Sequence, residues 1–510
     1  MTNRMEYHGR NSGWGWRAVC GALALGAVLV SAAIVARAQE APNYTVLYTF
    51  AGTGANGEFP QANLIRDRAG NLYSTTSNGG NLSECFGAGC GVVFKVDESG
   101  NETVLYNFKG GADGAYPYMG LVRDEAGNLY STTHGGGDLS GNSTCTETFG
   151  FPGCGVVFKV DPAGKETVVY AFTGGADGLG PSSGLVRDEV GNLYGTTAFG
   201  GDLNGECPGE GLPGCGVVFK VHPTGKETVL HTFTGGADGY APYGNLLLDA
   251  AGDLYGTAVG GGDVSGFCSN VGGFLGCGTV FKLDRTGKFT VLHTFKNGAD
   301  GAGPNGFLVL DNAGNLYGMT FYGGDLSGCS GLGCGVVFKV GKSGKETVLY
   351  RFKGGADGAG PYAGVVGDAA GNLYGTTVLG GEFTDPLCIS VGCGVAFKLD
   401  PTGKETVLHT FTGGEDGVNP SANLLQDEEG NLYGTAVGGG DLSCSPTYGC
   451  GVVFKIALPY GADLDTSQAD VAAAGDETTE KARVVLPENV QKLLQQRRGF
   501  GRFRVPMGPQ

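Results

Sequence analysis

The side chains best suited to chemistry in this sequence are acids that recur at fixed positions in Gly-rich segments. One set comprises Asp113, Asp177, Asp238, Asp300, Asp357 and Asp416, with Asn56 in the first copy. A second set comprises Asp138, Asp202, Asp263, Asp325 and Asp441, with Asn81 and Glu382 as substitutes. Oxygen-rich loops can bind Ca²⁺. However, Asp before Gly is also the residue of an ordinary turn, and no Asp-x-Asp-x-Asp-Gly run is present. We therefore expect turns and no cofactor, with Ca²⁺ as the alternative.

Aromatic residues in the same segments are the second candidate set for binding. The main candidates are Tyr116, Tyr240 and Tyr362, and the set also includes Phe59, Tyr118, Tyr243 and Tyr448. They differ from copy to copy, as expected for a specific binding face. Tyrosine offers a flat apolar ring with a polar tip and can stack on sugar rings or peptide side chains. A glycan, a peptide or a cell-envelope component is therefore the ligand class that we expect, although such side chains can also pack inside their own loops.

The sequence offers little that would carry a reaction. We find no nucleophile elbow, no phosphate-binding loop and no pair of carboxylates in a distinct local context. His231, His293 and His409 replace Tyr at one repeated position, which indicates a structural role, and only His134 lies in a segment suited to a site. We therefore predict no catalytic residues and favour a binding or scaffold protein. A lyase or hydrolase acting on an extracellular substrate is the alternative.

Cysteines indicate the compartment. Of the 15 cysteines, fourteen fall two per repeat, and the second of each pair always precedes Gly. This spacing predicts seven local disulfides: Cys85–Cys90, Cys145–Cys154, Cys207–Cys215, Cys268–Cys277, Cys329–Cys334, Cys388–Cys393 and Cys444–Cys450. Zinc is the rival interpretation, but no His accompanies the pairs and their spacing drifts. Disulfides persist in oxidising compartments, so we expect a periplasmic, cell-surface or extracellular location.

The N-terminus and the charge agree with export. Arg4, Arg10 and Arg17 precede an apolar run that ends at Ala-Arg-Ala, which predicts a signal peptide over residues 1–38. An uncleaved anchor is the alternative. The formal net charge of −17 disfavours nucleic acid and anionic membranes as partners. We expect a monomer without a transmembrane domain after cleavage.

The candidate residues are positioned by a sevenfold repeat. A Thr-Val-Leu-type segment starts at Thr45, Thr103, Thr167, Thr228, Thr290, Thr347 and Thr406. Each repeat contains four short strand signals separated by turn residues. One of them, Val-Val-Phe-Lys-Val, is apolar on both faces, which favours sheets sandwiched between neighbouring sheets. The sequence therefore predicts an all-β, seven-bladed β-propeller over residues 44–456 with four antiparallel strands per blade. A stacked solenoid is the poorer alternative.

The ends of the repeat region predict how the ring closes. The first strand, residues 45–50, lacks preceding strands of its own blade, and the last strand, residues 451–456, lacks a successor. We expect these two strands to pair and so to remove exposed sheet edges.

The sequence also predicts the register of the hairpin between the third and fourth strands. We expect each Lys of the third strand to face a Glu of the fourth strand: Lys95 with Glu102, Lys159 with Glu166, Lys220 with Glu227, Lys339 with Glu346 and Lys398 with Glu405. At the two exceptions, Lys282 would face Phe289 and Lys455 would face Tyr44.

The segment that follows the repeats differs in composition. For residues 461–510 the sequence predicts an acidic linker and a basic tail, largely disordered, with a short helix.

The repeated Gly-Asn-Leu-Tyr-Gly-Thr-Thr, Cys-Gly-Val-Val-Phe-Lys and Glu-Thr-Val-Leu-Tyr segments resemble the GloVer tandem repeat of bacterial choice-of-anchor proteins. The resemblance covers about Thr45 to Ile456. It implies export and a repeat-built domain, and it brings no catalytic residues to this chain. The sequence shows no recognisable C-terminal anchor motif, so attachment to a cell surface does not follow from the resemblance.

Overall fold

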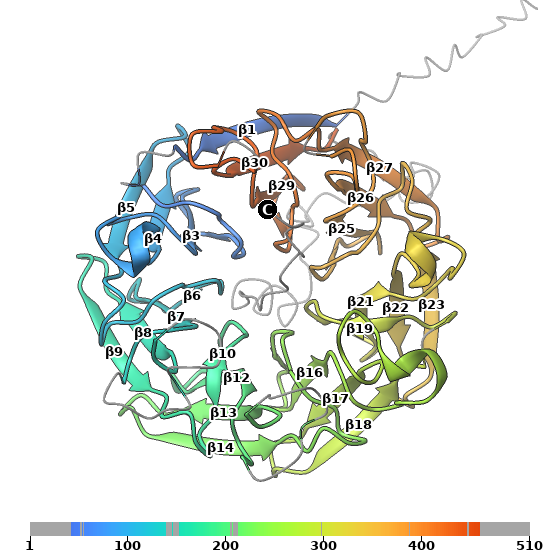
Figure 1. Ribbon diagram of the computed structural model, residues 1–510, viewed down its shortest axis with the longest axis horizontal. Coiled ribbons are helices and arrows are strands. Elements are labelled where there is room, and N and C mark those ends of the chain that lie inside the picture. Colours follow the sequence, from blue (N-terminus) through green and yellow to red (C-terminus); the bar gives the residue numbers. More distant parts are fainter. Residues whose placement is uncertain are drawn as a thin grey trace, which may run out of the picture. The chain divides into compact units, whose positions relative to one another are not determined.

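The computed structural model describes residues 42–459 except 52–53, 55, 139–144, 146–151, 204–206, 208–212, 297, 387 and 446–447. The signal peptide predicted over residues 1–38 and the tail predicted over residues 461–510 lie outside this part of the chain. The described residues form seven antiparallel sheets, or blades, arranged in a ring (Figure 1). No helix within them is both long enough and apolar enough to cross a membrane.

Blades 1 to 6 each take four strands in chain order, and the innermost strand of a blade is the shortest. Blade 1 contains β2 (Ile65–Arg66), β3 (Leu72–Thr76), β4 (Val92–Val96) and β5 (Glu102–Asn107). Blade 2 contains β6 (Val122–Arg123), β7 (Leu129–Thr133), β8 (Val156–Val160) and β9 (Glu166–Ala171). Blade 3 contains β11 (Val186–Arg187), β12 (Leu193–Phe199), β13 (Val217–Val221) and β14 (Glu227–Thr232), with β10 (Leu179–Pro181) beside β12. Blade 4 contains β15 (Leu247–Leu248), β16 (Leu254–Ala258), β17 (Thr279–Leu283) and β18 (Phe289–Thr294).

The remaining blades repeat this plan. Blade 5 contains β20 (Val309–Leu310), β21 (Leu316–Tyr322), β22 (Val336–Val340) and β23 (Glu346–Arg351), with β19 (Ala302–Pro304) beside β21. Blade 6 contains β24 (Val366–Gly367), β25 (Leu373–Thr377), β26 (Val395–Leu399) and β27 (Glu405–Thr410). Blade 7 contains β28 (Leu425–Gln426), β29 (Leu432–Ala436), β30 (Val452–Ala457) and β1 (Asn43–Thr49). Short 3₁₀ helices lie in three of the Gly-rich loops: η1 (Cys85–Gly87), η2 (Gly266–Ser269) and η3 (Cys329–Gly331).

Adjacent blades are joined by aromatic contacts at their third strands. Phe94 in β4 is fully buried and packs edge to face on Phe50, which follows β1, with ring centroids 5.1 Å apart. The same contact recurs around the ring at centroid distances of 5.0 to 5.4 Å, in the pairs Phe108–Phe158, Phe172–Phe219, Phe233–Phe281, Phe295–Phe338, Phe352–Phe397 and Phe411–Phe454. Such pairs stabilise by about 0.5–1.5 kcal/mol beyond the area they bury. The strand that is apolar on both faces is thus buried on both faces because a neighbouring blade covers each one.

The first described strand pairs with the last. β1 runs antiparallel to β30, with Thr45 opposite Lys455 and Tyr44 opposite Ile456. The strands cover residues 43–49 and 452–457, close to the predicted 45–50 and 451–456. Blade 7 is therefore built from both ends of the repeat region (Figure 1).

The predicted pairing of Lys with Glu across the outer hairpins is wrong by one residue. In blade 1, Lys95 lies opposite Thr103 and Glu102 lies opposite Val96. The shift arises because Asp97 and Asn101 close the hairpin around a three-residue loop in which Gly100 adopts a φ of 82°. The same offset applies at Lys159, Lys220, Lys282, Lys339, Lys398 and Lys455.

The lysines instead lie beside the tyrosines of the second strands. Tyr73 is directly opposite Lys95 across the β3–β4 pair. Lys220 Nζ lies 5.5 Å from the centroid of the Tyr194 ring, and Lys339 Nζ lies 5.3 Å from that of Tyr317. These are cation–π distances. The repeated tyrosine is therefore a structural residue, in agreement with its presence in every copy.

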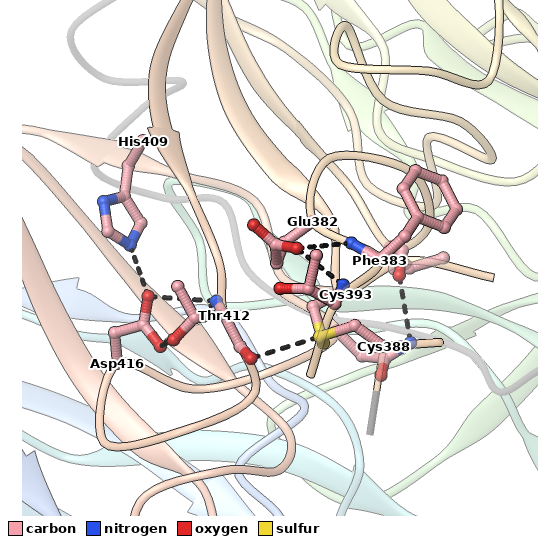
Figure 2. The surroundings of a disulfide bond; sticks show 10 residues. Glu382, Phe383, Cys388, Cys393, His409, Thr412 and Asp416 are labelled. Carbon is pink, nitrogen blue, oxygen red and sulfur yellow. Dashed lines mark hydrogen bonds and ion pairs between the residues drawn. A yellow bond between two sulfur atoms is a disulfide. The ribbon is translucent and has the colours of Figure 1, made fainter. Parts of the chain in front are cut away.

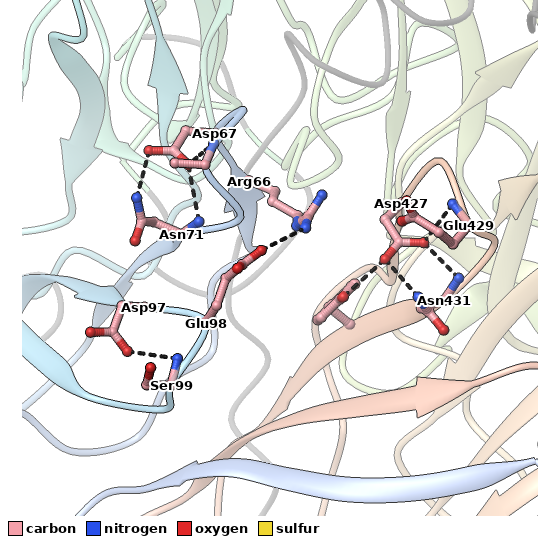
Figure 3. A network of polar contacts seen from close by, with 11 residues as sticks. Arg66, Asp67, Asn71, Asp97, Glu98, Ser99, Asp427, Glu429 and Asn431 are labelled. Atoms are coloured by element: carbon pink, nitrogen blue, oxygen red, sulfur yellow. Dashed lines mark hydrogen bonds and ion pairs between the residues drawn. The ribbon is translucent and has the colours of Figure 1, made fainter.

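The hairpins between first and second strands are fixed by one aspartate. Asp67 accepts hydrogen bonds from the Asn71 backbone N at 3.0 Å, from Asn71 Nδ2 at 2.9 Å and from the Tyr73 hydroxyl at 2.9 Å. Figure 3 shows this turn in blade 1, its counterpart at Asp427 and Asn431 in blade 7, and the 3.3 Å ion pair of Arg66 with Glu98. In an antiparallel blade these turns and the outer hairpins lie at the same end of the strands. This end, the turn face, carries short connections only.

Candidate functional site

The opposite end of the strands, called the loop face here, carries the two long connections of each blade. One is the Gly-rich loop between second and third strands, and the other joins the fourth strand to the next blade. All seven predicted disulfides are present in the first kind of loop. Cys388 Sγ lies 3.2 Å from the carbonyl oxygen of Thr412, so the disulfide touches the neighbouring connection (Figure 2). This disulfide thus closes its own loop and also contacts the connection to the next blade.

The first set of aspartates holds the connections between blades. Asp113 Oδ2 accepts hydrogen bonds from the Tyr106 hydroxyl and from the Lys109 backbone N, each at 2.9 Å. In blade 6, Asp416 Oδ2 lies 2.9 Å from His409 Nε2 and 3.1 Å from the Thr412 backbone N (Figure 2). Equivalent bonds engage Asp177, Asp238, Asp300 and Asp357. These carboxylates therefore act as loop caps, and the histidines replace Tyr as their partners.

The electrostatics of these caps follow from the same bonds. Burial by itself would raise the pKa of Asp238, but hydrogen bonds from His231 and Thr234 outweigh it and lower the pKa. The carboxylate is consequently held ionised within its own loop.

The second set of acids forms tight turns in the disulfide loops. Asp263, Asp325 and Asp441 each accept a hydrogen bond from the backbone N of the serine two residues later, at 2.8 to 2.9 Å. Glu382 accepts from the backbone N of Phe383 and of Thr384 (Figure 2). In the described part of the chain, no group of three His, Cys, Asp or Glu side chains is arranged to hold a metal ion.

Four of the predicted loop aromatics, Tyr116, Tyr118, Tyr240 and Tyr362, are buried, whereas Phe59, Tyr243 and Tyr448 are partly exposed. Tyr116, Tyr240 and Tyr362 are only 3%, 1% and 7% exposed. The hydroxyl of Tyr240 accepts a hydrogen bond from the Leu275 backbone N at 2.8 Å, which fixes that disulfide loop. The structure does not bring the three tyrosines together with the aspartate caps on one exposed surface. Their burial depends on the neighbouring blade, which no single repeat reveals.

A buried apolar cluster lies near the centre of the ring, and the buried polar residues Asn63, Ser182, Asn245 and Asn305 occupy equivalent positions in other blades. Tyr118 and Met119 of blade 2 belong to one buried cluster with Phe307 of blade 5 and Tyr362 of blade 6. Blades 2 and 5 are not neighbours, so this cluster spans the ring axis. His134 lies at its edge, with its ring centroid 5.7 Å from that of Tyr118. Among the described residues, this region thus combines packed aromatic side chains with neutral polar ones.

The fourth-strand glutamates form an ionisable set that sequence reasoning assigned wrongly. Glu102, Glu166, Glu227, Glu346 and Glu405 each keep Oε1 buried without a hydrogen-bond partner. Burial raises the pKa of Glu166 to about 7, with a further contribution from the Asp113 carboxylate and an opposing one from Lys109. These side chains face the seams between blades. The repeated Glu in the sequence could have indicated this buried set, but the incorrectly predicted register paired each Glu with a Lys.

A hollow of about 430 Å³ opens beside the third disulfide. It is lined by Gly201, Asp202, Cys215, Thr232, Phe233 and Thr234. The volume is in the range of small-molecule sites. Its lining has one ionisable side chain, Asp202, so the hollow by itself indicates no reaction.

Comparison with known proteins identifies the repeat. A family model described as the Gloeobacter/Verrucomicrobia repeat matches residues 31–205, 144–325, 205–447 and 332–481. No curated protein matches the sequence.

The comparison with solved structures finds matches at low similarity. A gluconolactonase from Xanthomonas campestris is 14% identical with a TM-score of 0.37, covering 82% of this chain and 90% of that one. A fungal alcohol oxidase in complex with copper is 14% identical with a TM-score of 0.47, covering 83% and 77%. A protein of unknown function from Dyadobacter fermentans is 12% identical with a TM-score of 0.39, covering 82% and 98%. At these values the likenesses carry no argument about activity.

Proposed function

The chain belongs to the Gloeobacter/Verrucomicrobia repeat family, and from that premise we propose that it is an exported binding propeller. Its loop face would present a rigid surface to a glycan, a peptide or a cell-envelope component. The observation that carries this proposal is the bracing of the loop face, where every disulfide closes its own loop and those of Cys145 and Cys388 also lie against the connection to the next blade. Loops held on a rigid scaffold are the usual place for binding residues.

Three further observations support the proposal. Seven disulfides fit an oxidising compartment. The net charge of −17 disfavours polyanionic partners. Near the ring axis, where an enzymatic alternative would gather its polar groups, Tyr118, Met119, Phe307 and Tyr362 form part of one buried apolar cluster.

Export is tested by expressing the full chain in a Gram-negative host and analysing the periplasm and the medium. We expect a product that begins at Gln39, as measured by mass spectrometry, with no free thiol after denaturation. Retention of the whole product in the cytoplasm with reduced cysteines would contradict export.

Binding is tested separately with the purified mature protein on a glycan and peptide array. We expect retention of a defined ligand class that is recovered uncleaved. Release of shortened products from the bound ligand would overturn the binding assignment in favour of a hydrolase or lyase.

A further inference from the structure

One position on the loop face breaks the sevenfold symmetry of the ring. In every blade, the connection entering the blade forms an antiparallel bridge with a residue at or close to the end of the second strand. The bridged residues are Glu58–Asn78, Ala115–Gly135, Leu179–Phe199, Tyr240–Gly260, Ala302–Tyr322, Ala359–Leu379 and Val418–Gly438. Only the pair in blade 1 consists of two polar, hydrogen-bonding side chains. The bridge does not need two polar side chains, since the six other blades form it without such a pair.

Neighbouring residues of blade 1 extend this polar pair. Gln61 Nε2 lies 3.5 Å from Ser77 Oγ, and Ser77 Oγ donates to Asn78 Oδ1 at 2.8 Å. The residues equivalent to Ser77 in the other blades are His134, Ala198, Val259, Phe321, Val378 and Val437. Blade 1 therefore carries a connected row of amide and hydroxyl groups, Gln61, Ser77 and Asn78, beside the Glu58 carboxylate. The polarity at Ser77 and at the bridged pair distinguishes blade 1, whereas other blades are also polar at the Gln61 position, with Ser182, Asn305 and Ser421.

Two aromatic rings border this row. Phe59 follows Glu58, and its ring centroid lies 6.0 Å from that of Tyr448 in the last disulfide loop. Both side chains are partly exposed, as are Glu58, Gln61 and Asn78, while Ser77 is buried. We call these six residues the blade-1 patch. It combines fixed hydrogen-bonding groups with an accessible aromatic surface.

Phe59 is also held in an unfavourable backbone conformation. Its φ is 60°, and the equivalent residues before the repeated proline have φ values of 50° to 65°, at Tyr116, Gly180, Ala241, Gly303, Gly360 and Asn419. Three of the seven are glycine, which adopts this region without strain. A bulky side chain there costs on the order of 1 kcal/mol. The fold imposes this conformation in all seven blades, but a partly exposed Phe there is less favourable than the glycine of three other blades, and strain of this kind is often retained for function.

From these observations we propose that the blade-1 patch binds a neutral glycan, an inference that rests on the proposed binding function. Amide and hydroxyl groups both donate and accept hydrogen bonds, which matches sugar hydroxyls, and an aromatic ring can cover the apolar face of a sugar. Glu58 is the one carboxylate of the patch, and the other hydrogen-bonding groups are neutral amides and hydroxyls. A basic peptide is therefore the less favoured occupant.

The test uses variants that copy residues found elsewhere in the ring. The first is Glu58→Ala with Asn78→Gly, which installs the pair present in blade 2. The second is Phe59→Gly, which installs the residue present in blades 3, 5 and 6. Glu125→Ala, an exposed residue of the turn face, is the matched control. Thermal melts establish that each variant is folded, and calorimetric titration with cellohexaose, chitohexaose and maltohexaose measures binding, with hexalysine as the cationic probe.

We expect the wild type to bind at least one hexasaccharide and not hexalysine. The double variant and Phe59→Gly should each bind that sugar about tenfold more weakly or worse, because hydrogen bonds or ring contacts are lost, whereas Glu125→Ala should match the wild type. Equal sugar binding by the double variant would overturn the patch while leaving the binding function in place. Binding of hexalysine alone would overturn the glycan assignment, and no binding of any probe, with an array that also finds no ligand, would overturn the binding function as well.

Discussion

At the scale of single residues, the fourth-strand glutamates make the stability of the ring depend on pH. Burial raises the pKa of Glu102, Glu166, Glu227 and Glu405 to about 7, from an ordinary value of 4.5. The folded state therefore binds protons more tightly than the unfolded chain. The resulting stability is fully present below pH 4.5 and is lost as the pH rises through 7.

We predict that changing these four glutamates to Gln flattens this dependence. Because the side chains are partly exposed, screening keeps each contribution to about 1 kcal/mol or less. The fourfold variant should melt above the wild type at pH 8 and close to it at pH 5, as measured by calorimetry. Glu125→Gln on the exposed turn face is the control. If the melting temperature of the fourfold variant changes between pH 5 and pH 8 as much as that of the wild type, these glutamates are not the groups that bind the protons.

At the scale of elements, the outer hairpin depends on one glycine. Gly100 has a φ of 82°, and a Cβ added to it would lie 2.7 Å from the carbonyl oxygen of Leu47 in β1. Gly100→Ala should therefore lower the free energy of unfolding by about 1–3 kcal/mol, measured by urea denaturation. Gly355→Ala is the matched control, because a Cβ at Gly355 meets nothing within 4 Å. Equal effects of the two changes would contradict the three-residue loop.

The disulfide loops are a second element whose contribution can be isolated. Each bridge closes a loop with a sequence separation of 5 to 9 residues, and the sheets do not depend on it for their hydrogen bonds. Replacing Cys388 and Cys393 by Ser should cost about 2 kcal/mol and leave the β-sheet circular dichroism spectrum unchanged. If the variant lacks the β-sheet spectrum in the absence of denaturant, the disulfide is needed for the blade itself and not only for its loop.

At the scale of the whole molecule, the ring depends on β1. Deleting residues 42–50 would leave β30 with an unpaired edge, and such edges promote association between chains. It would also remove Phe50 and its contact with Phe94. We expect a shortened chain starting at Ala51 to associate and to lose cooperative unfolding, whereas one starting at Pro42 stays monomeric, as measured by sedimentation and calorimetry. A monomer with an unchanged melting temperature would show that the ring holds without this strand.

The repeat explains why much of this could be predicted and where prediction failed. Blade number, strand order and disulfide pairs recur seven times, so each was supported by seven observations. The hairpin register was wrong because Gly100 adds a third residue to the loop, a local choice that hydrophobic pattern does not reveal. Burial of Tyr116 was missed because it depends on contacts between blades. The polarity of Glu58 and Asn78 is visible only when the seven copies are compared with each other.

The antiparallel pairing of β1 with β30 places Asn43 directly opposite Ala457. The two ends of the propeller are thus neighbours, and the polypeptide has no structural need to start where it does. A gene that joins these ends through a short peptide and opens the chain at another outer hairpin should encode the same ring. Such a circular permutant could fuse a second protein to any chosen blade, on the side away from the loops that we expect to meet a ligand.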